Sequence, residues 1–522
     1  MEYTGFKPPA NWTIERVKLE TLSPESFFEN YVAKRKPVVV CGVLPSFNTD
    51  EWNDPTFLAG FKTKISVTGS SNGFDVAKST RKLSASKGNL NSTSRSITAG
   101  DCLVQVETKV DGAFGSGKER MRMPFSELVD RLVKGDSNIY MTTQYEDFET
   151  SPELTASLSD DELNALRTIS TWCQNPLTHL LPLLNPRPPL LGNLAPQQIN
   201  LWLGRSSPDG GSSSGLHHDF ADNLYSLLLG KKSFKLFAPS EAGNMYLAGT
   251  NPRIFANGLI AYVEGKRCTV RADGARHIDV AQWKVRTCQR TVDELESKLA
   301  KSRKKKDKGT LQEELSLAEA ELEASMDSLL ALQVGGDTMG QSSGGNGLAA
   351  EDDEDEDEGD EGDGNDIDDF EDDFEDVDDD TEDGNDSSGK RQRLTATSTT
   401  FASNAPKPLP PSFSKVPAGT LTKPDPPALN DFPLVRLSNG IDCDLEPGEM
   451  LYLPAGWFHE VSSRGDSGEG ATSGLHMAVN YWLHPPTTTT FESPYEDGYW
   501  REVWEDTIEP QLKAWRTCLV GK

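Results

Sequence analysis

Hydrophobic and polar positions along the chain follow two periods, and each predicts a different part of the fold. Residues 216–283 contain short apolar runs separated by Gly and Pro, as in an antiparallel double sheet, and such runs resume over 432–483. Helical spacing marks the two ends of the chain. Residues 23–32 begin at a serine that can cap a helix, and residues 500–515 repeat aromatic or aliphatic side chains every three or four positions. The pattern predicts a mainly β fold with flanking N- and C-terminal helices.

The pattern changes between the two β-rich parts. Residues 291–333 have apolar positions that approximate an a/d seam, which predicts an inserted coiled-coil-like helix. The seam is formed by Leu311, Leu315, Ala318, Leu322 and Leu329. Residues 334–428 are first rich in Gly and Ser, then acidic, then rich in Ser, Thr and Pro. Such a composition buries too little apolar area to offset chain entropy, so this stretch is predicted to be disordered.

These patterns divide the chain into five segments. They are the N-terminal helices with the first part of the sheet (1–290), the inserted helix (291–333), the disordered insertion (334–428), the second part of the sheet (429–490) and a Trp-rich C-terminal helix (491–522). The aromatic stripe of the last helix can either pack on its own sheet or pair with a second copy in a homodimer.

Charge is concentrated in one place. The 522 residues carry a net charge of −30, and residues 351–386 alone hold 25 acidic side chains and no basic one. The rest of the chain is only mildly acidic, which makes nucleic acid an unlikely partner. The acidic run can bind a basic partner or serve as a solubilising linker. The basic clusters at 301–308 and 390–393 are either nuclear-import signals or solvated charge.

The remaining composition bears on the compartment. Seven cysteines occur without a CxxC pair, which argues against a zinc ribbon and a disulfide framework. The first residues lack the apolar core of a signal peptide, and no run of 18 apolar residues predicts a membrane span. We therefore expect an intracellular protein of the nucleus, the cytoplasm or both, without a membrane partner.

Three side chains suggest a metal centre. His217 and Asp219 are two positions apart, so on a strand both face one side, and His459 ends a second apolar run. Two imidazoles and one carboxylate form the facial triad of non-haem Fe(II) oxygenases. Only seven histidines occur in the chain, which makes this pairing more notable. The alternatives are a structural or different divalent-metal site, and for His459 a packed core histidine beside two aromatic residues.

A lysine follows the first two candidates. Lys232 ends an apolar strand, fifteen residues after His217, where it can point into the barrel and pair with the distal carboxylate of an oxo-acid. Lys231 or Lys235 can do so instead, since a bulge near Gly230 would shift the register. The plainer alternative is three solvated lysines on an edge strand.

Together these motifs resemble the JmjC-domain, cupin-fold 2-oxoglutarate oxygenases, in particular their small hydroxylase-type branch. The matching stretches are Leu216–Tyr225, Gly230–Pro239, Gly448–Val461 and Ala478–Trp482, with Pro37–Gly42 similar to the family's N-terminal strand. The resemblance covers roughly residues 20–285 and 430–520. It implies a double-stranded β-helix, the jelly-roll or cupin barrel, interrupted by the long helical and disordered insertion.

The resemblance also implies roles for individual residues. Fe(II) ligands fall on His217, Asp219 and His459, and 2-oxoglutarate contacts on Lys232, Tyr140, Ser214, Asn223 and Asn480, with O2 as the second co-substrate. For the two asparagines the alternative is that they satisfy buried backbone groups. One departure from the family is the block inserted before His459. If it leaves and re-enters at a loop, its length costs little entropy, but a break within a strand would undermine the role of His459.

The implied activity is that of a dioxygenase that hydroxylates a protein side chain and releases succinate and CO2. Demethylation of N-methyl-lysine is the second expectation, and it is weakened by the absence of a zinc or tudor-like chromatin module in the sequence. Hydroxylation of a tRNA base is a third. A fourth is a non-catalytic interaction protein with a degenerate barrel, in which the inserted helix and the acidic run are the active parts. The complete triad favours an enzyme over a scaffold.

Overall fold

A computed structural model describes most of the chain outside the insertion. The described residues are 2–45, 47–67, 93–109, 114, 120–144, 158–207, 211–262, 268–302, 305–334, 409–421, 427–467, 470 and 472–519. Most of the stretch predicted to be disordered, including the acidic run, lies outside them.

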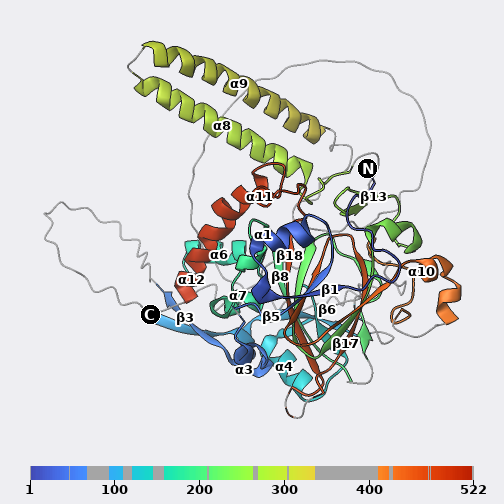
Figure 1. The fold of residues 1–522 in the computed structure, drawn as a ribbon. Helices are drawn as coiled ribbons and strands as arrows, with labels where there is room; N and C mark the ends of the chain where they lie inside the picture. Colours follow the sequence, from blue (N-terminus) through green and yellow to red (C-terminus); the bar gives the residue numbers. More distant parts are fainter. Residues whose placement is uncertain are drawn as a thin grey trace, which may run out of the picture. The chain divides into compact units, whose positions relative to one another are not determined.

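Two β-sheets form the body of the described chain (Figure 1). The large sheet runs in the order β1 (Glu15–Lys18), β2 (Val38–Cys41), β16 (Glu449–Leu453), β11 (Asp222–Leu229), β18 (Leu475–Leu483), β8 (Pro196–Arg205), β7 (Ile139–Met141), β5 (Leu103–Thr108) and β6 (Arg120–Pro124). The small sheet runs β10 (His217–His218), β17 (Phe458–Arg464), β12 (Lys231–Phe237) and β15 (Ile441–Leu445), and β9 (Ser212–Ser213) also pairs with β17. Two hairpins stand apart, β3 (Lys62–Val67) with β4 (Thr93–Thr98) and β13 (Pro252–Ile254) with β14 (Ile260–Tyr262). This arrangement confirms the predicted jelly-roll, cupin-like fold.

The alternation of side chains explains why the large sheet is buried on both faces. On β11, Tyr225 and Leu227 point to the small sheet and share a core cluster with its Phe234. Leu224 and Leu228 point the other way, into a larger cluster shared with the helices. Because both faces are covered, every residue of β11 is buried, and its apolar side chains point to both faces.

Helices cover the outer face of the large sheet (Figure 1). They are α1 (Pro24–Phe27), which continues as a π-helix (Phe28–Val32), α2 (Thr49–Trp52), α3 (Pro55–Gly60), α4 (Phe125–Val133), α6 (Asp160–Ser170), α7 (Leu177–Leu180), α11 (Tyr499–Glu502), a π-helix (Val503–Ile508) and α12 (Glu509–Leu519). None of the helices in the described part of the chain is long and apolar enough to cross a bilayer.

The C-terminal helix uses its aromatic stripe within the chain. Trp504, Ile508, Leu512 and Trp515 are buried in the core cluster of the large sheet, and the indole N–H of Trp515 donates to the carbonyl of Thr178 at 3.1 Å. The stripe is thus packed on its own fold, which was one of the two expected arrangements. Homodimerisation through this helix stays a prediction.

The inserted helix differs from the prediction. Instead of one helix over 291–333, the chain forms two, α8 (His277–Lys301) and α9 (Lys305–Val334), so helical structure begins before residue 290. They pack side by side (Figure 1), with the Cys288 thiol 3.6 Å from the Ser325 hydroxyl. The helix breaks at Ser302, within a run of lysines and an arginine whose like charges repel one another along a continuous helix. Near the N-terminal end of α8, the indole N–H of Trp283 donates to the Glu502 carboxylate at 2.7 Å.

The disorder predicted over 334–428 is wrong for residues 409–421. These residues are described and pack against the small sheet, with Val416 buried among Leu216, Phe237 and Phe458. The composition of the whole tract does not reveal that a few of its apolar residues, such as Val416 and Leu421, join a hydrophobic cluster with the small sheet. A short 3-10 helix (Pro427–Asn430) and α10 (Pro433–Leu437) then lead into β15.

Candidate metal centre

The metal candidates lie at one corner of the barrel, where the chain twice crosses between the sheets. Residues 219–221 connect β10 to β11, and residues 454–457 connect β16 to β17. The two crossings touch, because the Gly456 N–H donates to the Asp219 carbonyl at 3.0 Å. The corner therefore brings together segments that are more than 230 residues apart in sequence.

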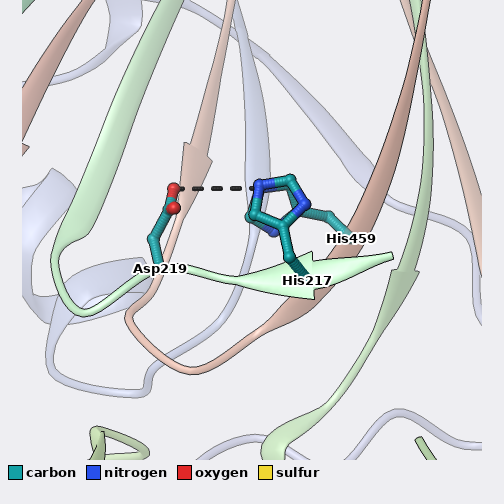
Figure 2. Close-up of side chains that lie close together, drawn as sticks. All are labelled: His217, Asp219 and His459. Carbon is teal, nitrogen blue, oxygen red and sulfur yellow. Dashed lines mark ion pairs between the residues drawn. The ribbon is translucent and has the colours of Figure 1, made fainter. Parts of the chain in front are cut away.

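His217, Asp219 and His459 converge at this corner (Figure 2). β10 pairs antiparallel with β17, and the register sets His217 directly opposite His459. One ligand atom from each of the three residues lies within 4.8 Å of the others, and His459 Nε2 is 3.8 Å from Asp219 Oδ2. The structure thus brings together all three residues that the sequence singled out.

Backbone carbonyls orient both imidazoles. His217 Nδ1 lies 2.9 Å from the Gly215 carbonyl, and His459 Nδ1 lies 3.0 Å from the Trp457 carbonyl. Because a carbonyl can only accept, each Nδ1 carries the proton and each Nε2 lone pair faces the triad. Burial, together with the nearby His459, lowers the pKa of His217, so that ring is neutral at pH 7. Neutral imidazoles with free Nε2 atoms are what a metal ion requires.

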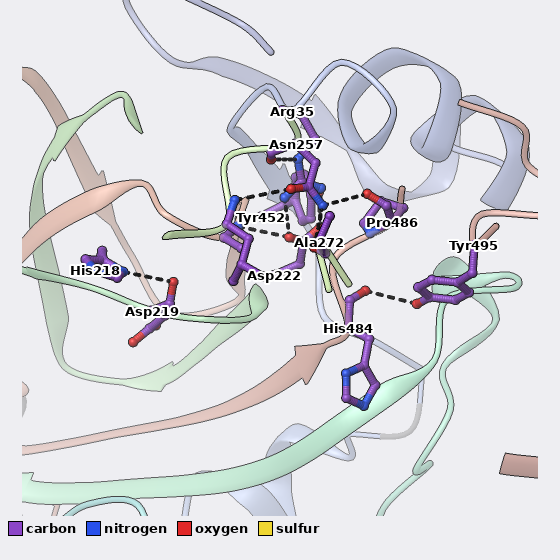
Figure 3. A network of polar contacts seen from close by, with 12 residues as sticks. Arg35, His218, Asp219, Asp222, Asn257, Ala272, Tyr452, His484, Pro486 and Tyr495 are labelled. Carbon is purple, nitrogen blue, oxygen red and sulfur yellow. Dashed lines mark hydrogen bonds and ion pairs between the residues drawn. The ribbon is translucent and has the colours of Figure 1, made fainter. Parts of the chain in front are cut away.

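A buried ion pair holds the corner in place (Figure 3). The Asp222 carboxylate receives the Arg35 guanidinium at 2.7 Å, the Tyr452 hydroxyl at 2.6 Å and the Ala455 N–H at 2.9 Å. Asp222 is three residues after Asp219, and Ala455 is four before His459, so one carboxylate ties both crossings together. Sequence reasoning missed this pair, because no local signal links Arg35 to a residue nearly two hundred positions away.

Lys232 points into the barrel, and the neighbouring lysines do not. Its side chain is 2% exposed, and Nζ donates to the Ser463 hydroxyl at 2.5 Å. Lys231 and Lys235 face outward, where they pair with Glu446 and Asp442. Desolvation lowers the pKa of Lys232 to about 7. A buried amine whose hydrogen-bond partner within the described residues is one hydroxyl is suited to receive a carboxylate.

Two aromatic rings form the wall beside this lysine. The Tyr140 centroid lies 5.6 Å from Lys232 Nζ and 5.7 Å from the ring centroid of His476. Both rings lie over Gly204, where a Cβ would come within 2.5 Å of Tyr140 and 2.8 Å of His476. Tyr140 was expected from the resemblance. His476 was missed, although it is one of only seven histidines.

A chain of amides leads from this wall to the metal candidates. The Trp202 indole donates to Asn480 Oδ1 at 2.8 Å, Asn480 Nδ2 donates to Asn223 Oδ1 at 3.0 Å, and Asn223 Nδ2 reaches Asp219 Oδ2 at 3.4 Å. Asn200 lies opposite Asn480 in the strand register, and its side chain is buried. Within the described structure, neither its amide nitrogen nor its amide oxygen has a hydrogen-bond partner. Unpartnered buried amides are rare, so Asn200 offers a donor and an acceptor to a ligand.

Ser214 lies at the edge of this region. Its hydroxyl donates to the Gly215 carbonyl at 2.9 Å and accepts from the Val461 N–H at 3.0 Å. The hydroxyl therefore fixes the turn that leads into β10. Its contact with 2-oxoglutarate stays a prediction.

Comparison with known proteins gives three matches. A family model described as a cupin-like domain matches residues 24–489. The chain is 32% identical over 516 residues to the JmjC domain-containing protein 4 of Schizosaccharomyces pombe, a match that covers 96% of this chain and 91% of that protein. It is 23% identical over 228 residues to the lysine-specific demethylase JMJ32 of Arabidopsis thaliana, covering 43% of this chain and 51% of that protein.

Proposed function

The chain belongs to the family of cupin-like JmjC-domain proteins, and on this premise we propose that it is an Fe(II)- and 2-oxoglutarate-dependent dioxygenase that hydroxylates a protein side chain. The observation that carries the proposal is the convergence of His217, Asp219 and His459 at one corner of a barrel that also holds a buried lysine.

The donor set fits the proposed metal. Two imidazoles and one carboxylate suit Fe(II), and three ligands on one side leave room for a bidentate oxo-acid and O2. In this proposal His217, Asp219 and His459 hold the ion, and Asn223 steadies the Asp219 carboxylate through its amide N–H. The carbonyls of Gly215 and Trp457 keep both imidazole rings in the binding tautomer.

The interior beside the triad fits 2-oxoglutarate. Lys232 would bind the carboxylate far from the metal, and the unpartnered amide of Asn200 would contact another oxygen. Tyr140, Asn480 and Ser214 remain proposed contacts from the same region. With its ion bound, the site would convert 2-oxoglutarate and O2 into succinate and CO2 while one oxygen atom enters a C–H bond of the substrate. The buried wall excludes water from this reaction.

The experiment measures succinate from 2-oxoglutarate with purified protein, Fe(II) and a peptide pool. We expect turnover in the wild type and none in His217→Ala. The exposed His277 at the start of α8 supplies a matched control, because His277→Ala removes an imidazole that is not part of the triad and should retain activity. A wild-type protein that binds no iron and yields no succinate with any pool would refute the proposal.

Demethylation of N-methyl-lysine is the second candidate, because one relative carries the name of a lysine-specific demethylase. The same oxidation on an N-methyl carbon releases formaldehyde. Mass spectrometry of the peptide pool separates the two activities. Hydroxylation adds the mass of one oxygen atom to a substrate, whereas demethylation removes the mass of one methylene group.

A further inference from the structure

One segment of the insertion returns to the metal centre. Residues 409–421, here called the returning segment, pass beside β10 through a series of turns, with Phe413 and Ser414 in β-bridges. The Ser414 N–H donates to the Leu216 carbonyl at 2.8 Å, and the His218 N–H donates to the Ser412 carbonyl at 3.2 Å. On its other side, the Ala248 N–H donates to the Phe413 carbonyl at 2.8 Å. The segment therefore forms isolated β-bridges through Phe413 and Ser414, and the Phe413 bridge lies opposite His217, the first metal candidate.

Phe413 of this segment lies flat on the ring of His217. The two centroids are 4.8 Å apart and the planes differ by 12°. The same imidazole is held at Nδ1 by the Gly215 carbonyl, and the His459 ring lies 4.3 Å away at 52°. One hydrogen bond leaves an imidazole free to tilt about that contact. The parallel ring of Phe413 restricts this tilt and so fixes the direction of Nε2.

The other end of the segment is fixed to the strand of the second histidine. The Glu460 carboxylate is completely buried and adjacent to His459 in sequence. It accepts hydrogen bonds from the Ser213 hydroxyl, the Gly419 N–H and the Leu421 N–H. The returning segment is thus attached to β17 at one end and stacked on β10 at the other.

We infer that Phe413 is a positioning residue for the metal centre and that the returning segment is a built-in part of the site. The inference rests on the proposed function, because it takes His217 as a metal ligand. The role of Phe413 is indirect, since its ring fixes the imidazole that binds the ion. A ligand held in its binding orientation before the metal arrives loses less entropy on binding, so affinity rises.

The test measures Co(II) binding to the full-length apoprotein. Calorimetry gives the affinity, and visible absorption reports the coordination geometry. Phe413→Ala and Phe413→Leu should weaken binding by about threefold to tenfold, the range expected for loss of an aromatic pair. Phe413→Tyr keeps the flat ring and should bind like the wild type. Phe432→Ala is the matched control, because Phe432 lies outside the returning segment and makes its edge-to-face ring contact with Tyr246 instead of a metal candidate. It should change neither affinity nor spectrum.

A second variant tests the segment without removing the ring. Ser414→Pro deletes the N–H that bonds to Leu216, and we expect the loss in Co(II) affinity to match that of Phe413→Ala. If Phe413→Leu, or a cooperatively folded Ser414→Pro, binds Co(II) as tightly as the wild type and with the same spectrum, the inference is overturned. A wild-type protein that binds no Co(II) would instead overturn the proposed function, so the two failures are distinguishable.

Discussion

Replacing Lys232 with methionine should make the apoprotein more stable while it destroys the proposed 2-oxoglutarate site. Burial lowers the pKa of Lys232 from 10.5 to about 7. At about 1.4 kcal/mol per pKa unit, the amine costs the folded state about 4 kcal/mol at pH 7. Methionine has a similar volume and no charge. It leaves the Ser463 hydroxyl without its partner, at a cost of about 1–3 kcal/mol. The net gain in the free energy of unfolding should be about 1–3 kcal/mol.

The dependence on pH identifies the cause. Between pH 7 and 10.5 the unfolded state holds the lysine proton and the folded state does not, so the wild type gains stability as pH rises. The advantage of Lys232→Met should therefore shrink by about 2 kcal/mol between pH 7 and 9. Urea denaturation of both apoproteins at the two pH values measures this difference.

A neighbouring lysine supplies the control. Lys231 lies in the same strand, and its side chain is 51% exposed and paired with Glu446. Lys231→Met should change the free energy of unfolding by about 0.5 kcal/mol or less and leave the KM for 2-oxoglutarate unchanged. The reasoning fails if Lys232→Met is less stable than the wild type at pH 7, or if their difference stays constant up to pH 9.

Three further changes test other parts of the site. In the wild type, the KM for 2-oxoglutarate should rise by up to about tenfold per pH unit above pH 7, because Lys232 must take up a proton to bind the carboxylate; Lys232→Arg should show no such rise. Gly204→Ala should raise the same KM and cost about 1–3 kcal/mol in thermal unfolding, since both aromatic rings over it must move. Arg35→Met should lower the free energy of unfolding by about 3–5 kcal/mol, as measured in urea, because Asp222 becomes a buried charge without its partner. A loss below about 1 kcal/mol would show that the pair is not a main support of the corner.

Local periodicity predicted the parts of the site that depend on which face of a strand a residue occupies. Alternation placed His217 and Asp219 on one side, and the buried run before Gly230 led to the inward Lys232. The sequence alone does not decide which of the three lysines points inward. The answer depends on the strand register, and the register shift near Leu227 and Leu229 arises from pairing with the distant strand β18.

The missed features depend on pairings that leave no local trace. The Arg35–Asp222 pair joins the segment after the N-terminal helix to a strand nearly two hundred residues later, and either residue alone resembles a surface charge. Phe413 lies in a tract rich in Ser and Pro, and one aromatic residue there does not alter the average on which a prediction of disorder rests. The heptad positions Leu311–Leu329 all lie in the second helix, so they carry no signal for the break near Ser302.

The insertion also sets the order in which the protein can be completed during its synthesis. His459 leaves the ribosome 240 residues after Asp219, a delay of roughly 10–50 s at ordinary rates of translation. The strands that pair with β11 and β12 are β15, β16, β17 and β18, all of which emerge after the insertion. During that interval the nascent chain presents apolar strands with unpaired edges, which are prone to aggregate. The growing polypeptide should therefore depend on chaperones at this stage, and the proposed metal ion can be captured only after His459 has been translated.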